Sequence, residues 1–263
     1  MVSYFIVCAS ALLVSALTLF SGFGLGTLLM PGFALFFPVE VAVAATAVVH
    51  AANNVFKVAV VGRHADRSLI WRFGIPAVLA AFAGASLLAY LSAFGELASY
   101  TIGSRTAVIT PLKLVMAVLI FVFALFELLP ALRDLKFDRK YLALGGLLSG
   151  FFGGLSGHQG ALRSAFLVKV GISTEAFVGT NAVIGFLVDV ARIITYATAL
   201  FAAQAASPIG AGQWPLILTG IGAAFAGVLA GKKFLGKITM KTIQTITGLL
   251  LLGISVALGI GIF

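Results

Sequence analysis

The chain carries one apolar pattern twice, and this repetition limits the folds that it can adopt. Trp71 is followed nine residues later by the run Ala-Ala-Phe-Ala-Gly, and Trp214 is followed nine residues later by the same run. Further upstream, Ser21-Gly-Phe and Ser149-Gly-Phe each open a glycine-rich interruption of an apolar stretch. We interpret the chain as an internal duplication within a membrane, where a duplication usually places a transport path between the two halves.

The composition identifies lipid as the surroundings of these apolar runs. Hydrophobic residues make up 61% of the chain and charged residues 10%, and the mean hydropathy is +1.16. A soluble domain of this length cannot bury so much apolar surface. Because the runs do not alternate as the strands of a barrel do, we predict an all-α polytopic membrane protein. The single cysteine, Cys8, excludes an internal disulfide and a cysteine-based metal site, and we expect no metal and no cofactor.

The net charge of +9 does not indicate a nucleic-acid partner. The basic residues stand mainly in short segments between the apolar spans, as Lys and Arg do in the cytoplasmic loops of membrane proteins. The lipid bilayer is therefore the partner that the charge distribution predicts, and no nucleic acid is expected.

Six apolar stretches are long enough to cross the roughly 30 Å hydrocarbon core as helices. They cover residues 40–61, 73–94, 112–130, 175–202, 214–231 and 241–262. Two further stretches, 3–37 and 141–170, are interrupted by glycines, and each limb of the second reaches only about half of the core. Each interrupted stretch either crosses the membrane or enters it and returns as a re-entrant hairpin.

The distribution of Lys and Arg favours re-entrant hairpins. With eight crossings, the two faces would carry seven and at least six basic residues, against the positive-inside rule. With hairpins and six crossings, Arg105 and Lys113 are the two bases on one face, and eleven lie on the other. The eleven are Arg63, Arg67, Arg72, Arg133, Lys136, Arg139, Lys140, Lys232, Lys233, Lys237 and Lys241.

We therefore predict two inverted-topology repeats, residues 1–135 and 136–263, each with a re-entrant or broken helix plus three transmembrane helices. Both termini then lie outside. The first limb, 3–21, is long for half a crossing, so the sequence leaves open whether 3–37 crosses fully or re-enters.

The second limb of a re-entrant hairpin starts near the bilayer midplane, where its first N–H groups have no partner within the helix. These groups and the positive end of the helix dipole attract anions. We predict that both hairpin tips bind the substrate, through Gly24, Gly26, Thr27, Gly157, His158 and Gln159. The alternative is that the glycines serve close helix packing, which is the role that we expect for Gly222 and Gly227.

Polar side chains inside two of the spans are further candidates. His50, Asn53 and Lys57 share one helix face, and Asn181 and Arg192 share a face of another helix. Ionisable groups are costly at this depth and usually face the bundle interior or a water-filled path. We assign these five residues to substrate binding.

Each ionisable residue in the spans also has a simpler explanation. Asp189 and Arg192 can neutralise each other three residues apart on one helix. Lys57 can extend to the membrane surface, and His50 can bridge helices. Arg163, one turn into the second limb of the second hairpin, either supplies charge to the anion site or points to a lipid headgroup.

The motifs resemble the TauE/SafE family of bacterial sulfite and sulfonate exporters over essentially the whole chain. The resemblance rests on the duplicated halves and on four short motifs. They are Gly22-Phe-Gly-Leu-Gly26 with Pro31, the Thr46 region, Ser149-Gly-Phe-Phe-Gly-Gly154, and Thr180-Asn181. It implies a permease of the bacterial inner membrane that exports a small sulfur-containing anion, such as sulfite or an organosulfonate. The second break reads Gly157-His-Gln-Gly160, where family members often carry a Gly-Gly-Gly-Pro run, so the resemblance does not extend to the shape of the second tip and does not specify the substrate.

We predict an alternating-access permease and not an enzyme, with a proton or sodium ion as the candidate coupling ion and the oligomeric state left open. Outward movement of one negative charge is favoured by about 2.3 kcal/mol per 100 mV of inside-negative potential. An anion channel is one alternative. A rhomboid-type intramembrane serine protease is another, because Gly154-Leu-Ser156-Gly157 fits the Gly-x-Ser-Gly pattern and His50 or His158 would have to act as the base.

Overall fold

The computed structural model describes residues 2–21, 25–103, 105–133, 135–202, 209–234 and 240–262, and these residues are mostly helical. The first half forms α1 (Val2–Ser21), α2 (Leu25–Ala34), α3 (Val39–Val61), α4 (Arg67–Leu69), α5 (Ile75–Ser92), α6 (Pro111–Leu128) and α7 (Pro130–Arg133). The second half forms α8 (Leu142–Ser156), α9 (Gly160–Leu167), α10 (Thr174–Ala202), α11 (Trp214–Phe234) and α12 (Met240–Gly259). Short helical turns are η1 (Gly62–His64), η2 (Ile70–Gly74), η3 (Arg139–Tyr141), η4 (Val168–Val170) and η5 (Ala211–Gln213).

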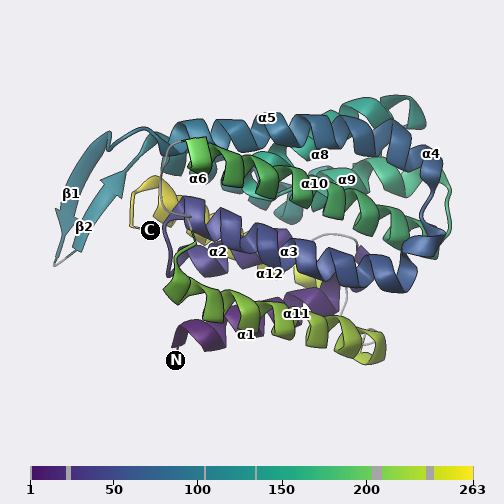
Figure 1. Ribbon diagram of the computed structural model, residues 1–263, viewed down its shortest axis with the longest axis horizontal. Helices are drawn as coiled ribbons and strands as arrows, with labels where there is room; N and C mark the ends of the chain where they lie inside the picture. Colours follow the sequence, from purple (N-terminus) through teal and green to yellow (C-terminus); the bar gives the residue numbers. More distant parts are fainter. Residues whose placement is uncertain are drawn as a thin grey trace.

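Five described helices are long and apolar enough to cross a membrane. They are Val39–His64, Arg67–Ser92, Pro111–Leu128, Thr174–Ala199 and Ala211–Ala230, which agree with five of the six predicted spans. The sixth predicted span coincides with α12, whose apolar part is the shorter segment Gln244–Gly259. The long helices lie roughly along one direction (Figure 1), as expected of a multi-pass membrane protein.

The predicted break in residues 141–170 is confirmed as a turn inside the protein. Helix α8 ends at Ser156, and Gly157 follows in the left-handed conformation at φ 82°, with its amide donating to the Gly153 carbonyl. Helix α9 then runs back along α8. The hydrogen bond between the Phe137 amide, just before α8, and the Ala165 carbonyl of α9, at 3.1 Å, shows this direction. The α8–α9 pair is therefore a hairpin with a buried tip.

The helix ends correct one detail of the two glycine-rich interruptions. Ser149-Gly-Phe was expected to open the second interruption, but α8 continues through Ser149 and ends at Ser156, whereas α1 ends at Ser21. Residues 22–24, including the predicted ligand Gly24, lie outside the described part of the chain.

The repeated Ala-Ala-Phe-Ala-Gly motif makes the same helix contact in both copies. Helix α5 packs on α8, and a Cβ added at Gly84 of α5 would lie 2.0 Å from the Phe151 carbonyl oxygen. Helix α11 packs on α1, and a Cβ added at Gly227 of α11 would lie 2.2 Å from the Leu12 carbonyl oxygen. Only glycine permits such backbone contact. The packing role predicted for Gly227 is confirmed, but a Cβ at Gly222 would meet no described atom within 4 Å, so that prediction is wrong.

The glycines within α8 serve packing rather than ligand binding. Cβ atoms added at Gly146, Gly150 and Gly154 would lie 2.3 Å or less from carbonyl oxygens of η2 and α5. These three glycines are four residues apart and form the helix face that lies against α5. Of the second glycine cluster, the tip residues from Gly157 onward remain as candidates for a site.

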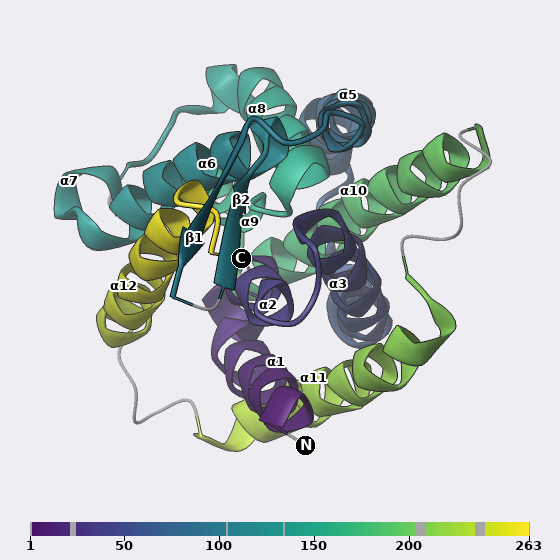
Figure 2. The same cartoon turned by 90° about the vertical axis from the view of Figure 1, so that its left-hand side faces the viewer.

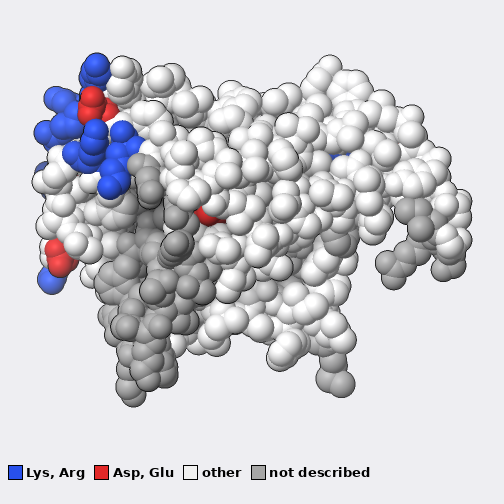
Figure 3. Space-filling model, turned by 180° about the vertical axis from the view of Figure 1, so that it is seen from behind, with Lys and Arg blue, Asp and Glu red and all other residues white. Residues whose placement is uncertain are grey.

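Viewed along the helix axes, α3 and α10 lie between the α5–α8 pair and the α1–α11 pair (Figure 2). An antiparallel β-hairpin, β1 (Ala98–Ile102) and β2 (Arg105–Ile109), extends from the same end as both termini (Figure 1) and was not predicted. Lys and Arg side chains gather at the opposite end, where α4 lies (Figure 3). We call these the hairpin end and the basic end. The side chains of residues 231–243 are outside the described set.

Candidate functional site

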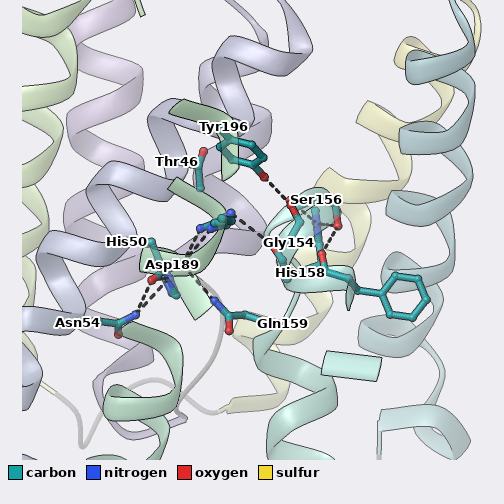
Figure 4. A network of polar contacts seen from close by, with 12 residues as sticks. Thr46, His50, Asn54, Gly154, Ser156, His158, Gln159, Asp189 and Tyr196 are labelled. Carbon is teal, nitrogen blue, oxygen red and sulfur yellow. Dashed lines mark hydrogen bonds and ion pairs between the residues drawn. The ribbon is translucent and has the colours of Figure 1, made fainter. Parts of the chain in front are cut away.

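A buried carboxylate on α10 joins the two central helices. Asp189 is fully buried, and its Oδ2 atom lies 2.7 Å from His50 Nδ1 and accepts a hydrogen bond of 2.9 Å from Asn54 Nδ2. His50 and Asn54 stand four residues apart on α3, so one face of α3 presents both to the carboxylate. Figure 4 shows His50 and Asn54 beside Asp189, so the contact joins titratable groups from the two halves of the chain.

The tip of the α8–α9 hairpin contacts the same carboxylate. Gln159 Nε2 donates to Asp189 Oδ1 at 3.2 Å, and Gln159 Oε1 accepts from Arg163 Nη1 at 3.0 Å. Arg163 Nε in turn donates to Asn181 Oδ1 at 2.6 Å. A continuous set of polar contacts therefore runs from α3 through α10 and the hairpin tip into α9.

Arg192 donates to the same oxygen of Asp189 as Gln159 does. Its Nη2 and Nε atoms donate to Asp189 Oδ1 at 2.8 and 3.1 Å. Its Nη1 atom lies against the tip, where a Cβ added at Gly157 would be 2.9 Å away. The absence of a side chain at Gly157 thus provides the space for the guanidinium.

Seven residues form what we call the central network, and each is between 0% and 8% exposed. They are His50, Asn54, Gln159, Arg163, Asn181, Asp189 and Arg192. Gly185 makes room within it, since a Cβ there would lie 2.8 Å from Asn54 Nδ2 and 3.2 Å from Arg163 Nη1. The central network is closed to solvent in this structure.

Among the described residues, basic side chains outnumber acidic ones at the central network. Arg163, Arg192 and the nearby Lys57 are buried, at 2%, 0% and 7% exposed, and the charge of Arg163 acts on Lys57. Asp189 is the described carboxylate in this cluster. The other deeply buried acid in the described part of the chain, Glu127, lies on α6 facing α12 at Gly248. Buried charge is costly unless paired, so the arrangement is suited to hold an additional anion.

Of the predicted site residues, four belong to the central network: His50, Gln159, Asn181 and Arg192. Lys57 and Gly157 lie beside it. Gly26 and Thr27 fall in the first turn of α2, as predicted, but their side chains are not described.

The described hydrogen bonds and ring contacts of Asn53 and His158 are with residues outside the central network. The side-chain oxygen Oδ1 of Asn53 accepts a hydrogen bond of 3.0 Å from the Ser15 hydroxyl of α1, whereas Asn53 Nδ2 is buried with no described partner. The His158 ring stacks on Phe123 of α6, with ring centroids 5.1 Å apart. His158 Nδ1 lies 3.1 Å from the Ser156 carbonyl oxygen, and its Nε2 atom has no described partner.

Three network members were absent from the predicted site: Asn54, Arg163 and Asp189. The sequence carried a signal for each, because all three are polar residues within apolar helices. The simpler reading of Asp189 and Arg192 as a neutralising pair is correct, but the pair also contacts Gln159 and lies against His50. Lys57 is buried and does not extend to the surface, so that alternative is wrong.

The protease alternative finds no support in the geometry of Ser156. Its hydroxyl donates to the Phe152 carbonyl of its own helix at 3.0 Å. His158 Nδ1 lies 3.2 Å from the hydroxyl oxygen, but within the described ranges no carboxylate contacts His158 to orient it as a base.

A cavity of about 530 Å³ opens at the hairpin end, apart from the central network. It is lined mainly by apolar side chains, including Phe36, Phe37 and Phe94, with Glu40 and Lys113 as its charged residues. The cavity lies between the end of α2, the start of α6 and Ile262, which follows α12.

A protein-family model described as sulfite exporter TauE/SafE matches residues 7–258 of the 263-residue chain. No curated protein and no solved structure gave a significant match.

Proposed function

The chain belongs to the sulfite exporter TauE/SafE family, and on that premise we propose that it exports a small sulfur oxyanion or organosulfonate through the central network. Transport occurs by alternating access, with substrate held between the α8–α9 tip and the central helices α3 and α10. The protein resides in the bacterial inner membrane with its basic end in the cytoplasm and both termini outside.

Two inverted repeats, 1–135 and 136–263, account for this architecture. Each hairpin packs against the long helix that carries the Ala-Ala-Phe-Ala-Gly motif of the other half, α8 against α5 and α1 against α11. The glycine that ends each motif, Gly84 or Gly227, makes the close backbone contact in each case. Such reciprocal packing supports a pseudo-two-fold axis that passes between the central helices, where transporters with inverted repeats bind their substrates.

The observation that carries the proposal is the excess of buried positive charge beside a hairpin tip. Three buried cations, Lys57, Arg163 and Arg192, share the centre with one carboxylate, Asp189. This positive charge attracts an oxyanion, and planar guanidinium groups suit its several oxygen atoms. The substrate is therefore an anion rather than a cation or a neutral solute.

The test is anion binding to purified protein, measured calorimetrically with sulfite, thiosulfate, sulfoacetate, taurine and chloride. Arg192→Gln should weaken binding of the preferred anion at least about tenfold, or ~1.4 kcal/mol, because a charge-assisted contact is lost. Arg163→Gln tests the same point without removing a direct partner of Asp189. Arg139→Gln is the matched control, because Arg139 lies exposed at the basic end.

Three results would overturn the proposal: binding of none of these anions, wild-type affinity in both buried variants, or an equal loss in the control. Flux into liposomes separates a permease from a channel. A permease should saturate with substrate concentration at a modest turnover, as the closed central network requires a conformational change for each cycle.

A further inference from the structure

The Asp189 carboxylate accepts hydrogen bonds from the same donors that a substrate anion would need. One of its oxygens accepts from Arg192 and Gln159, and the other accepts from Asn54 and contacts His50. A carboxylate is itself an oxyanion, and charge-assisted hydrogen bonds of this kind are the strong ones. The guanidinium of Arg192 is therefore engaged by a resident anion in the closed structure.

We propose that the protein is a proton-coupled anion transporter, in which the buried His50–Asp189 pair takes up one proton for each anion that engages Arg192. This coupling rests on the proposed function and specifies its energetics. The proton enters from solution and resides on the pair, while the anion replaces the Asp189 carboxylate as the partner of Arg192. One positive charge and one anion enter together, so a monovalent substrate leaves the net charge of the site unchanged.

The surroundings of Asp189 favour this exchange over simple addition of an anion. The charged and titratable groups that face it are His50 from α3, Arg163 from α9, and Arg192 and Tyr196 from α10 itself; Lys57 of α3 lies beside Arg163. Helices α5 and α8, which pack against α10, contain no Asp, Glu, Lys, Arg or His in their sequences.

Asp189 is thus the negative charge that a second anion would meet at Arg192. Two negative charges that compete for the same guanidinium in a dry site repel each other. A proton on the pair removes that repulsion, and a protonated Asp189 can still donate to His50 and accept from Asn54.

The coupling has a consequence for the driving force. A uniporter of a monovalent anion would be driven outward by the membrane potential. Movement of one monovalent anion with one proton carries no net charge, so the potential does not drive it. The direction of transport is then set by the sum of the anion and proton gradients.

The experiment measures proton uptake by the full chain in weakly buffered detergent solution when sulfoacetate or sulfite is added. Wild type should take up one proton per bound anion, and its affinity should fall about tenfold per pH unit above neutral pH, as linkage to one proton requires. Asp189→Asn should bind the anion without taking up a proton from solution, and its affinity should depend little on pH. Sulfite exchanges protons of its own, but equally in both proteins, so the difference between them reports Asp189.

Asp138→Asn is the matched control, because Asp138 is exposed and paired with Lys169 at the basic end; it should behave as wild type. Anion binding by wild type without proton uptake would overturn the coupling and leave the proposed function intact. Failure of every anion to bind would overturn the proposed function itself. If Asp189→Asn does not fold, flux of a monovalent organosulfonate through wild type in liposomes decides: a pH gradient should drive uptake at zero potential, and a potential alone should not.

Discussion

At the scale of single residues, the two buried polar atoms without described partners define different roles for Asn53 and His158. A buried donor without a partner costs about 1–3 kcal/mol, which a ligand can recover on binding. Asn53 Nδ2 is such a donor on α3, one residue from the central-network member Asn54.

Asn53→Leu should therefore weaken anion binding about tenfold while leaving the thermal unfolding temperature unchanged or raised. The substitution keeps the size of the side chain but removes a donor that only a bound solute would satisfy. Calorimetric binding and a thermal melt of the same preparation measure both effects. Ser15→Ala is the comparison, since it removes the described partner of Asn53 and leaves Nδ2 in place. Unchanged anion affinity in Asn53→Leu would exclude a ligand role.

The ligand role predicted for His158 from the sequence stays a prediction, and the chemistry of its ring makes it testable. Its Nδ1 atom lies 3.1 Å from the Ser156 carbonyl oxygen, which only accepts, so the ring proton is on Nδ1. In a neutral ring, Nε2 is then an acceptor and repels an anion rather than binding it. Stacking on Phe123 accounts for the position of the ring.

His158→Phe should accordingly bind anions as wild type does, because it retains the stacking. His158→Ala should lower stability by about 2 kcal/mol or more through the cavity that it leaves beside Phe123. Binding titrations and chemical denaturation of the two variants separate the cases. Loss of anion binding in the Phe variant at full stability would restore the ligand role predicted from the sequence.

At the scale of helices, the repeated motif was informative because it encodes a helix contact rather than a ligand site. The glycine that ends it, Gly84 or Gly227, approaches a backbone oxygen of the opposite half, at Phe151 or Leu12. Sequence alone could mark the motif as important, but it could not say which glycines contact a helix and which contact a guanidinium. That distinction depends on the rotation of each helix about its axis, which tertiary packing determines.

Gly84→Ala and Gly227→Ala should each destabilise the protein by about 1–3 kcal/mol, because an added methyl group would overlap a backbone oxygen. Similar losses at both positions are expected if the two contacts are equivalent. Gly222→Ala, on the same helix as Gly227, is the control; its Cβ meets no described atom within 4 Å, and alanine favours the helix. Chemical denaturation in detergent measures all three. A stable Gly227→Ala beside an unstable Gly84→Ala would contradict the equivalence.

At the scale of the whole molecule, hydropathy and glycine spacing could predict five of the spans and the break at Gly157. The β-hairpin was not predicted, although Tyr-Thr-Ile-Gly at residues 100–103 is a strand-and-turn pattern. The short pattern lies between two long apolar helices, whose hydropathy is a stronger signal. The central network could be predicted only in part. His50 and Asp189 lie 139 residues apart in the chain, and their contact follows from the packing of α3 on α10, which no local pattern encodes.

The orientation of the halves can be tested by labelling single cysteines on intact cells, in a background where Cys8, the one native cysteine, is replaced by alanine. Gly95 and Gly212 are exposed positions with no atom near an added Cβ, and they precede α6 and α11 respectively. If the repeats are inverted, Gly95→Cys and Gly212→Cys should both react with a membrane-impermeant maleimide from outside. His64→Cys and Asp138→Cys, at the basic end, should react only after the cells are permeabilised. Parallel repeats would instead place positions 64 and 212, which precede the two tryptophan motifs, on the same side of the membrane. Reaction of both under identical conditions would therefore remove the two-fold axis, and with it the reason to place substrate between α3, α10 and the hairpin tip.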